Sequence, residues 1–430
     1  MIKQFLQYAV PSALAMFISS LYTIIDGIFV GQGVGDYALA AVNLAMPFTI
    51  MIFGIATMFA VGGGALISKN LGAGNKDEAI NIFRQCLKFL LFISILICFF
   101  ATVFTNPISR ILGAEGDLRE LTITYIRYYG VFCIPNVIGI ALNSFVRNDG
   151  RPKLAMFSTI SGAVTNVILD YIFIFPLSIG IRGAAIATGL GQLVTVSLLL
   201  PHFLKRKGNL SFGKVKLEKN IIREFINIGI PSFFTEITFS IIILFSNIAI
   251  VRVIGDVGLS AFSIINYITT NIYMILLGLA FGAQPLISYY YGAKEINKVK
   301  EIYKITIISS LIINLVYSSI CFIFGNSIIS IFSSNNEIIS LTYIGLNIFN
   351  LGFFIDGLNL TTTVYYQAIE KPKYSNIICA LRSIICLPIV LIILSKTLGL
   401  NGVWISFIIS ELMTFILIML CMNVKNKSSF

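Results

Sequence analysis

Five carboxylates fall inside long apolar stretches of this sequence: Asp26, Asp170, Glu236, Asp356 and Glu411. An ionised carboxylate in hydrocarbon costs at least ~2.5 kcal/mol, so such residues usually face a cavity and mark the path of an ion or a substrate. Their chemistry is to bind and release a proton, a metal cation or an organic cation. The structural alternative is a buried acid that stays protonated or pairs with a neighbour. That alternative weighs most for Glu411, whose role the sequence leaves open.

Three polar side chains share one depth, because Asp26, Asp170 and Thr188 each lie five to seven residues from the turn that ends their stretch. A helix rises about 1.5 Å per residue, which places all three roughly 8–10 Å below the surface. Asn166 lies four residues before Asp170 and therefore on the same helix face. Two carboxylates, an amide and a hydroxyl at one level predict a proton site or an oxygen-lined Na⁺ site.

Glu236 and Asp356 lie near the middle of their apolar stretches and share a second, deeper level. They predict a second site, for a proton, a cation or a substrate, in the C-terminal half of the chain.

The elements that position these acids are membrane-spanning helices. The chain has 430 residues, of which 57% are hydrophobic and 11% charged, whereas about 25% are charged in an average soluble domain. Stretches of about 20 apolar residues, long enough to cross a bilayer, recur along the whole sequence. We predict an all-α integral membrane protein with twelve transmembrane helices, near residues 8–31, 38–68, 79–105, 120–145, 153–176, 183–204, 222–253, 259–288, 298–324, 338–368, 374–396 and 401–422.

The lysines and arginines set the orientation, because they favour the cytoplasmic side. With the N-terminus inside, that side receives most of them, including the run from Lys205 to Arg223 and Arg382. The outer side keeps Arg110, Arg119, Arg127, Arg182, Arg252 and Lys396. We therefore predict a multi-pass protein of the cell membrane with both termini in the cytoplasm. This layout explains the net charge of +11 without a nucleic-acid partner.

Two smaller observations concern the ends of the spans. No cleavable signal peptide is expected, because residues 1–8 lead directly into a helix of spanning length. The single histidine, His202, lies at the cytoplasmic end of a span. We expect it to be an interface residue rather than a proton carrier.

The sequence repeats itself at an offset of 220 residues. The matching pairs are Pro11-Ser12 with Pro231-Ser232, Gly35-Asp36 with Gly255-Asp256, Gly72-Ala73 with Gly292-Ala293, and Pro152-Lys153 with Pro372-Lys373. Each half holds six spans, an even number, so both halves enter the membrane in the same direction. We predict two parallel-related six-helix bundles around a central cavity: an N-terminal lobe at 1–204, a cytoplasmic linker at 205–221 and a C-terminal lobe at 222–430. Rocking of the two lobes gives alternating access.

The buried acids do not follow the repeat. Asp26 matches Ser246, and Asp170 matches Val390. Asp356 matches Asn136. Residues that the shared fold needs should match between the halves, so this mismatch favours a functional role for the acids.

The sequence resembles the MATE (multidrug and toxic compound extrusion) family. The resemblance covers essentially the whole chain and rests on Gly35–Ala41, Gly72–Ala79 and Arg147–Lys153, each with a counterpart in the second half. It implies secondary active export of cationic or amphipathic organic compounds by H⁺ or Na⁺ antiport, with no cofactor beyond the coupling ion.

The resemblance also implies site residues. The family's N-lobe cation site uses an Asp in helix 1, an Asn and an Asp four apart in helix 5, and a Thr in helix 6; Asp26, Asn166, Asp170 and Thr188 match these positions. Members with a C-lobe site place acids in helices 7 and 10, which Glu236 and Asp356 match. Because both sets are present, the choice between H⁺ and Na⁺ and between the lobes stays open.

Two other classes of function fit these residues less well. A lipid-linked oligosaccharide or peptidoglycan-precursor flippase of the same superfamily would carry basic cavity residues to hold pyrophosphate, whereas the buried charges here read as acidic. A membrane enzyme would need a catalytic constellation, and the sequence has neither a His-rich metal site nor a Gly-rich phosphate loop. We expect a monomer that is not an enzyme, with small organic cations and membrane lipids as partners.

Overall fold

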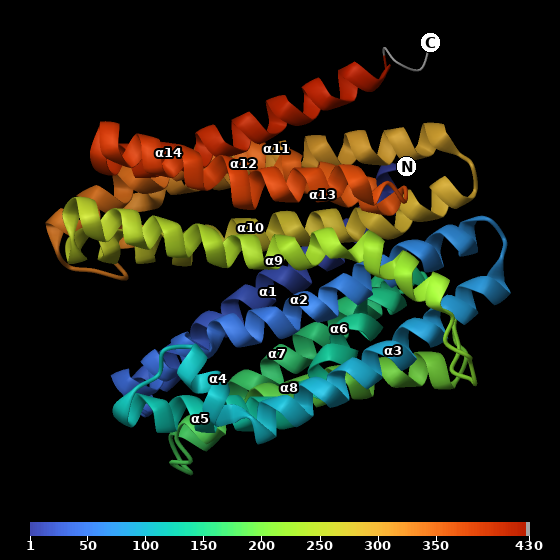
Figure 1. Ribbon diagram of the computed structural model, residues 1–430, viewed down its shortest axis with the longest axis horizontal. Helices are drawn as coiled ribbons and strands as arrows, with labels where there is room; N and C mark the ends of the chain where they lie inside the picture. Colours follow the sequence, from blue (N-terminus) through green and yellow to red (C-terminus); the bar gives the residue numbers. More distant parts are fainter. Residues whose placement is uncertain (427–430) are drawn as a thin grey trace.

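The computed structural model describes the backbone of residues 1–426 and the side chains of residues 1–419 apart from 117, 239, 240 and 256. This part of the chain folds into helices joined by short turns (Figure 1). The elements are α1 (Ile2–Gly33), α2 (Asp36–Gly72), α3 (Lys76–Val103), α4 (Thr105–Ile111), α5 (Gly116–Val131), α6 (Cys133–Asn148), α7 (Pro152–Ile174), α8 (Ile181–Leu204), α9 (Lys219–Ile254), α10 (Asp256–Gly292), α11 (Ile296–Ile329), α12 (Asn336–Ala368), α13 (Pro372–Ala380), the π-helix η1 (Leu381–Cys386) and α14 (Leu387–Asn426).

Ten helices are long and apolar enough to cross a membrane, and the bent pair α5 and α6 makes an eleventh span. The tenth covers Pro372–Met419, which is 48 residues. A straight helix of that length would measure about 72 Å, more than twice the hydrocarbon thickness. Its backbone leaves the helical conformation at Gly399, with φ 58° and ψ −134°. Arg382 and Glu411 hydrogen-bond to each other across this break, so the segment turns back and crosses twice. The twelve predicted spans are therefore all present.

The fourth span differs from the prediction, which had one continuous helix at 120–145. The helix is broken at Phe132, and α5 and α6 meet there at 53°. Pro135 supplies the physical reason, because a proline ring clashes with the carbonyl group four residues earlier, which here belongs to Val131.

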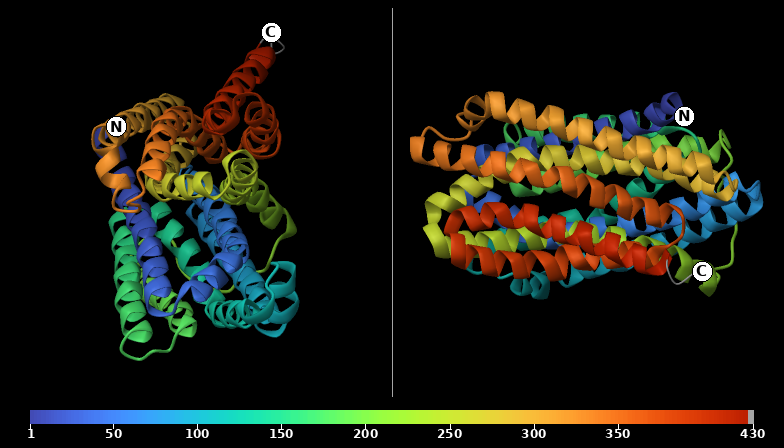
Figure 2. Two further views of the ribbon diagram at one scale, coloured as in Figure 1. Left: turned by 90° about the vertical axis from the view of Figure 1, so that its left-hand side faces the viewer. Right: turned by 90° about the horizontal axis from the view of Figure 1, so that it is seen from above.

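The helices form two bundles, one of α1–α8 and one of α9–α14. Figure 2 (left) looks along the helices and shows most of α1–α8, from blue to green, on one side and α9–α14, from yellow-green to red, on the other, with the N-terminal end of α1 beside the orange helices. Each bundle has its own hydrophobic core: one centres on residues such as Phe83, Phe145 and Phe203, the other on Phe262, Phe349 and Trp404. Residues 427–430 of the predicted C-terminal lobe lie outside the described residues.

The turns of the molecule lie at two opposite ends. One end, here called the basic face, carries residue 1 and the turns at 73–75, 149–151, 205–218, 293–295 and 369–371, and it lies on the right in Figure 1. The other end, here called the opposite face, carries the turns at 34–35, 112–115, 175–180, 255, 330–335 and Gly399.

Glycines bring the backbones of the two lobes into direct contact near the basic face. A Cβ atom at Gly72 of α2 would lie 1.9 Å from the carbonyl oxygen of Tyr289, and a Cβ atom at Gly292 of α10 would lie 1.9 Å from that of Lys69. These two contacts are equivalent under the 220-residue offset. The side chains of Lys69 and Glu370 add an ion pair across the lobes, with 2.5 Å between Nζ and Oε2. Only glycine permits such an approach at these positions.

The predicted linker lies against the N-terminal lobe. The carboxylate of Asp149 accepts hydrogen bonds from the backbone N–H groups of Asn209, at 2.8 Å, and Leu210, at 3.3 Å. The same carboxylate is 2.7 Å from Nε2 of His202. Arg84 of α3 donates to the carbonyl oxygen of Ser211 at 2.9 Å. His202, expected at the membrane interface, is thus buried under the linker and paired with an acid.

Candidate functional site

The structure brings the four N-terminal candidate residues together from three helices. Asp26 comes from α1, Asn166 and Asp170 from α7, and Thr188 from α8. The amide of Asn166 donates to Oγ1 of Thr188 at 3.4 Å, and the carboxyl groups of Asp26 and Asp170 interact electrostatically with each other. We call these four residues the N-lobe cluster.

Small residues allow this approach of α7 and α8. A Cβ atom at Gly162 would lie 2.8 Å from the carbonyl oxygen of Gly191, and one at Gly191 would lie 2.7 Å from that of Gly162. The two backbones therefore touch one turn away from Asn166. This contact holds the amide and the Thr188 hydroxyl at one level.

Four oxygens of the N-lobe cluster lack a donor among the described residues. Oδ1 of Asp26, Oδ1 of Asn166 and both carboxylate oxygens of Asp170 have no hydrogen-bond partner among the described residues. Asp170 and Asn166 are buried, with 0% and 2% of their surface exposed. A buried acceptor that stays unsatisfied costs about 1–3 kcal/mol. A bound proton or a hard cation, which prefers oxygen ligands, would remove that cost.

Two tyrosines of α5, Tyr125 and Tyr129, lie near the N-lobe cluster and were not among the residues predicted from the sequence. The rings of Tyr125 and Tyr129 stack with centroids 6.0 Å apart, and the Tyr129 hydroxyl accepts from the amide of Asn136 at 2.6 Å. The charges of Asp26 and Asp170 act on Tyr125. The four-residue spacing of the two tyrosines was the available signal, since it places both rings on one helix face.

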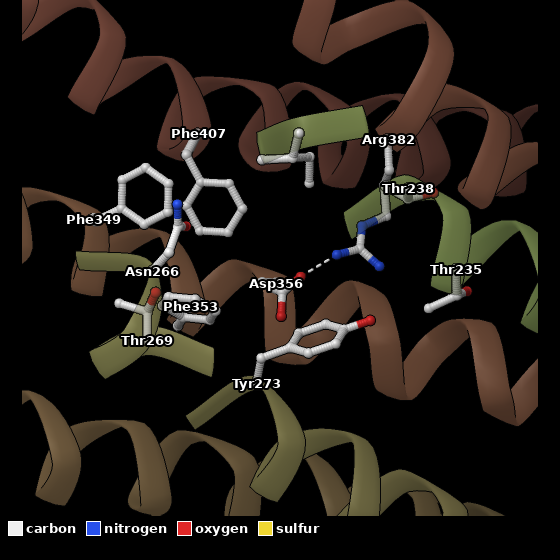
Figure 3. Close-up of a pocket in the computed structure, with 11 residues that line it drawn as sticks. Thr235, Thr238, Asn266, Thr269, Tyr273, Phe349, Phe353, Asp356, Arg382 and Phe407 are labelled. Atoms are coloured by element: carbon white, nitrogen blue, oxygen red, sulfur yellow. Dashed lines mark hydrogen bonds and ion pairs between the residues drawn. The ribbon is translucent and has the colours of Figure 1, made fainter. Parts of the chain in front are cut away.

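The C-terminal half holds a different arrangement, built on a buried arginine. Arg382 of η1 donates from Nη2 to Oδ1 of Asp356 on α12 and from Nε to both carboxylate oxygens of Glu411 on α14, at 3.0 and 3.1 Å. The amide of Asn359 donates to Oε2 of Glu411 at 2.7 Å. Figure 3 shows the Arg382 side chain reaching down to Asp356. We call Asp356, Arg382 and Glu411 the C-lobe triad.

Arg382 corrects two sequence expectations. It was counted among the cytoplasmic basic residues, but it lies ten residues beyond Pro372, which is about 15 Å into the bundle, and only 5% of its side chain is exposed. The statement that the buried charges are acidic is therefore wrong for the C-terminal lobe. Counting basic residues assigns every arginine to an aqueous side, whereas an arginine that pairs with acids is tolerated inside a bundle.

A small pocket lies inside the C-terminal lobe next to the C-lobe triad. Its polar lining is Thr235, Thr238, Asn266, Thr269, Tyr273, Asp356 and Arg382, and its apolar lining is Ile242, Phe349, Phe353 and Phe407. The rings of Phe349 and Phe407 stack with centroids 4.6 Å apart. Oδ2 of Asp356, the oxygen not used by Arg382, has no hydrogen-bond partner among the described residues. The pocket therefore combines aromatic walls with one free carboxylate oxygen (Figure 3).

Glu236 stands apart from this pocket. It lies on α9, is buried with 7% of its surface exposed, and its Oε1 has no hydrogen-bond partner among the described residues. Asp356, with which it was predicted to form a site, is instead paired with Arg382. The charges of both Glu236 and Asp356 act on the side chain of Tyr273.

Two six-helix bundles that repeat one sequence pattern, each with a buried polar cluster, define a multi-pass membrane protein of the two-lobed transporter class. The MatE family model matches residues 11–172 and again 231–392. The second match is displaced by 220 residues, the offset of the internal repeat. The chain belongs to the MatE family. Its members are transporters rather than enzymes, as the sequence analysis expected.

Individual relatives cover nearly the full length. The chain is 25% identical to "Multidrug export protein MepA" of Staphylococcus saprophyticus over 413 residues, which cover 95% of this chain and 90% of that protein. It is 25% identical to the protein of the same name from Staphylococcus aureus strain NCTC 8325 over 411 residues, with the same coverage of 95% and 90%.

Solved structures of similar proteins have the same fold. A multidrug resistance MATE family transporter of the MOP superfamily, in an outward-facing conformation, matches with a TM-score of 0.93 and 25% identity, over 99% of this chain and 96% of that one. A MOP superfamily transporter from Pyrococcus furiosus, described as having a binding pocket of reverse polarity, matches with a TM-score of 0.92 and 26% identity, over 98% and 95%. The predicted twelve-helix, two-lobed membrane fold is thus confirmed.

Proposed function

We propose that this protein exports cationic or amphipathic organic compounds from the cell by antiport with H⁺ or Na⁺. The observation that carries the proposal is the N-lobe cluster of α1, α7 and α8, in which carboxylate and amide oxygens of α1 and α7 have no donor among the described residues. Such a cluster binds a cation reversibly, because the cation supplies the partners that the protein withholds. The relatives named as multidrug export proteins support the same function.

Ion binding at Asp26, Asn166, Asp170 and Thr188 would drive export by changing the net charge of the N-lobe cluster. With both carboxylates ionised the cluster carries two negative charges, and the charge falls by one when H⁺ or Na⁺ binds. Since α1 contacts α10 of the other lobe while α7 and α8 stay within their own lobe, a shift of Asp26 relative to Asp170 is transmitted to the lobe interface. The bound ion thereby biases which face of the protein is closed.

Alternating access would open and close the contacts at the basic face. The glycine contacts of Gly72 and Gly292, and the hydrogen bond from Tyr290 to Gln4 at 2.8 Å, hold the lobes together there. A hydrogen bond between Ser20 and Asn271, at 2.7 Å, lies nearer the middle. In this arrangement the lobes are joined at the basic face. Export requires these contacts to separate when a compound enters from that side.

The basic face would lie in the cytoplasm, since the lysines and arginines gather there. This places both termini inside and the protein in the cell membrane as a monomer surrounded by lipid. Compounds would then enter at the basic face and leave at the opposite face.

The C-terminal pocket would hold part of the exported compound. Phe349, Phe353 and Phe407 offer aromatic surface, and the free Oδ2 of Asp356 offers a partner for a cationic group. Glu236 adds a second buried acid on α9. Together these features suit amphipathic cations.

The alternative, a flippase for lipid-linked precursors, needs a basic cavity that holds pyrophosphate. Arg382 is the one arginine in the lining of the C-terminal pocket, and two carboxylates already occupy its guanidinium. The C-lobe triad carries a net charge of −1 when both acids are ionised. A pyrophosphate would be repelled there, so the geometry favours export of cations.

The test is dye efflux from proteoliposomes with the pH gradient and the Na⁺ gradient imposed separately. We expect one gradient to drive efflux and the other to be inert. Efflux that needs neither gradient would contradict antiport. Transport of a lipid-linked precursor in place of dyes would support the flippase.

A further inference from the structure

The C-lobe triad consists of two ion pairs that share Arg382 and join three segments of the chain. Asp356 belongs to α12, Arg382 to η1 and Glu411 to α14. All three side chains are at most 5% exposed. Arg382 is the only cation hydrogen-bonded to either acid among the described residues. Its guanidinium therefore occupies the position between two carboxylates that a mobile cation would otherwise take.

The local backbone places Arg382 at this position. The spanning segment changes from an α-helix to a π-helix over Leu381–Cys386, and Arg382 is the second residue of that π-helix. Such insertions are rare and often occur at functional sites, because the wider turn changes the direction of a side chain. Asn359, three residues after Asp356 on α12, donates to Oε2 of Glu411, which also accepts from Nε of Arg382. The acids are thus oriented toward the guanidinium from both sides.

The equivalent positions of the N-terminal lobe show that the arginine is not required by the scaffold. Under the repeat offset, Arg382 matches Gly162 and Asp356 matches Asn136. At Gly162 even a Cβ atom would lie 2.2 Å from Oγ1 of Thr195. The N-terminal lobe has no room for a side chain at this point, and its two acids, Asp26 and Asp170, lie elsewhere and have no basic partner among the described residues.

We propose that Arg382 is a tethered cation that takes the place of a mobile one between Asp356 and Glu411, so that ion binding is confined to the N-lobe cluster. Arg382 is then a specificity-determining residue. It supplies a fixed positive charge to the two acids of the C-terminal lobe and leaves Oδ2 of Asp356 for the exported compound. The proposal deepens the proposed function by assigning the coupling ion to one lobe, but it concerns binding and is tested without transport.

A buried arginine between acids has a clear energetic consequence. Removal of one partner from a buried ion pair is strongly destabilising, because a charge is left uncompensated. Without Arg382, two buried carboxylates would face each other and would recruit H⁺ or Na⁺ to lower that cost. Substitution of Arg382 should therefore create a cation site that the natural protein lacks.

The experiment counts bound cations on the purified full chain in lipid nanodiscs. Na⁺ binding is followed by titration calorimetry, and proton binding by the infrared band of protonated carboxyl groups as the pH is varied. We expect the double variant Asp26→Asn/Asp170→Asn to lose the cation signal of the natural protein. We expect Arg382→Met to gain one cation per chain, and Arg382→Lys, which keeps the charge, to gain none. Single Trp404, buried in the same lobe, reports by its fluorescence whether the gained cation binds there.

Two results would overturn the proposal. One is a cation signal that survives Asp26→Asn/Asp170→Asn and disappears with Asp356→Asn. The other is an Arg382→Met variant that folds but gains no cation. If Arg382→Met does not fold, the neutral triple variant Asp356→Asn/Arg382→Met/Glu411→Gln decides: the same number of bound cations as in the natural protein supports the proposal, and a smaller number contradicts it. Absence of ion-driven efflux in the natural protein would refute the proposed function but not this pattern of binding.

Discussion

The two lobes of this transporter bury acids in the same scaffold but provide different partners for them. In the N-terminal lobe, Asp26 and Asp170 have carboxylate oxygens without a donor in the part of the chain that the structure describes. In the C-terminal lobe, Asp356 and Glu411 share the guanidinium of Arg382. A cluster that carries its own counter-ion has no need to exchange one, whereas a cluster without it must take up H⁺, Na⁺ or another cation. Ion coupling therefore depends less on the number of buried acids than on whether a fixed basic side chain is paired with them.

The largest expected effect falls on the N-lobe cluster. Asp26→Asn and Asp170→Asn each remove a charge that the mobile cation balances, so we expect ion-driven dye efflux to fall to background, at least 100-fold below the natural protein. Insertion and folding should be unchanged, since an amide replaces a carboxylate of the same shape. Efflux from proteoliposomes measures the effect. Asp77→Asn, at the exposed start of α3, is the matched control and should retain full efflux.

The second prediction concerns a feature that the two lobes share. Gly72→Ala and Gly292→Ala each place a methyl group against a backbone carbonyl oxygen of the other lobe. Overpacking of this kind typically costs about 1–3 kcal/mol. We expect the contact at the basic face to weaken about 5- to 100-fold, by the same factor in both variants. Distances between spin labels on the ends of α2 and α10 measure the separation.

The control for these glycines is Gly31→Ala, because its Cβ atom would meet only a flexible side-chain end of Leu39 at 3.4 Å. A closed basic face in Gly72→Ala would contradict the role of this contact. Unequal effects of the two variants would show that the pseudo-symmetry of the scaffold does not extend to its energetics.

A third, smaller effect should come from the C-terminal lobe. Asp356→Asn and Glu236→Gln remove buried acids that the proposed function assigns to the compound rather than to the coupling ion. We expect export of cationic dyes to fall about tenfold, the size of one charge-assisted hydrogen bond, while export of neutral compounds changes less. Competition between a cationic and a neutral substrate of similar size measures the ratio. An equal loss for both classes would count against a role of these acids in substrate binding.

The sequence predicted those features that depend on local chemistry and on the repeat. Twelve spans follow from apolar stretches, and the N-lobe cluster follows from depth and the four-residue spacing of Asn166 and Asp170. The bend at Phe132 was missed, although Pro135 was visible. The C-lobe triad was also missed, because Arg382 and Glu411 are 29 residues apart and meet only through the turn at Gly399. A partner that depends on a tertiary turn leaves no periodic signal.

The smallest expected effect lies at the ion pair of Lys69 and Glu370, where the lobes also differ. The positions equivalent to Lys69 and Glu370 are Tyr289 and Gly150, so the basic face has this ion pair on one side only. Burial raises the pKa of the Glu370 carboxyl, the hydrogen bond and charge of Lys69 lower it by less, and Glu224 raises it further. The net direction is upward while the lobes are closed.

The sign of the pH dependence follows from this direction. When the basic face opens, the carboxyl returns to water and to its ordinary pKa, so the closed state binds the proton more tightly. The stabilisation of the closed state is complete below the ordinary pKa and is lost as the pH rises through the raised value. Acidification on the side of the basic face should therefore favour closure, and Glu370→Gln should remove this dependence.

Substitution of the two partners should have unequal effects. Lys69→Met leaves a half-buried carboxylate without its cation, whereas Glu370→Gln leaves a lysine that reaches water, because the Lys69 side chain is 34% exposed and that of Glu370 is 16% exposed. A partly exposed pair contributes about 0.2–1 kcal/mol. We expect Lys69→Met to shift the closed population by no more than about fivefold and Glu370→Gln by less, measured with the same spin labels on α2 and α10. A larger effect of Glu370→Gln would mean that the ion pair, rather than the burial of Glu370, governs this side of the basic face.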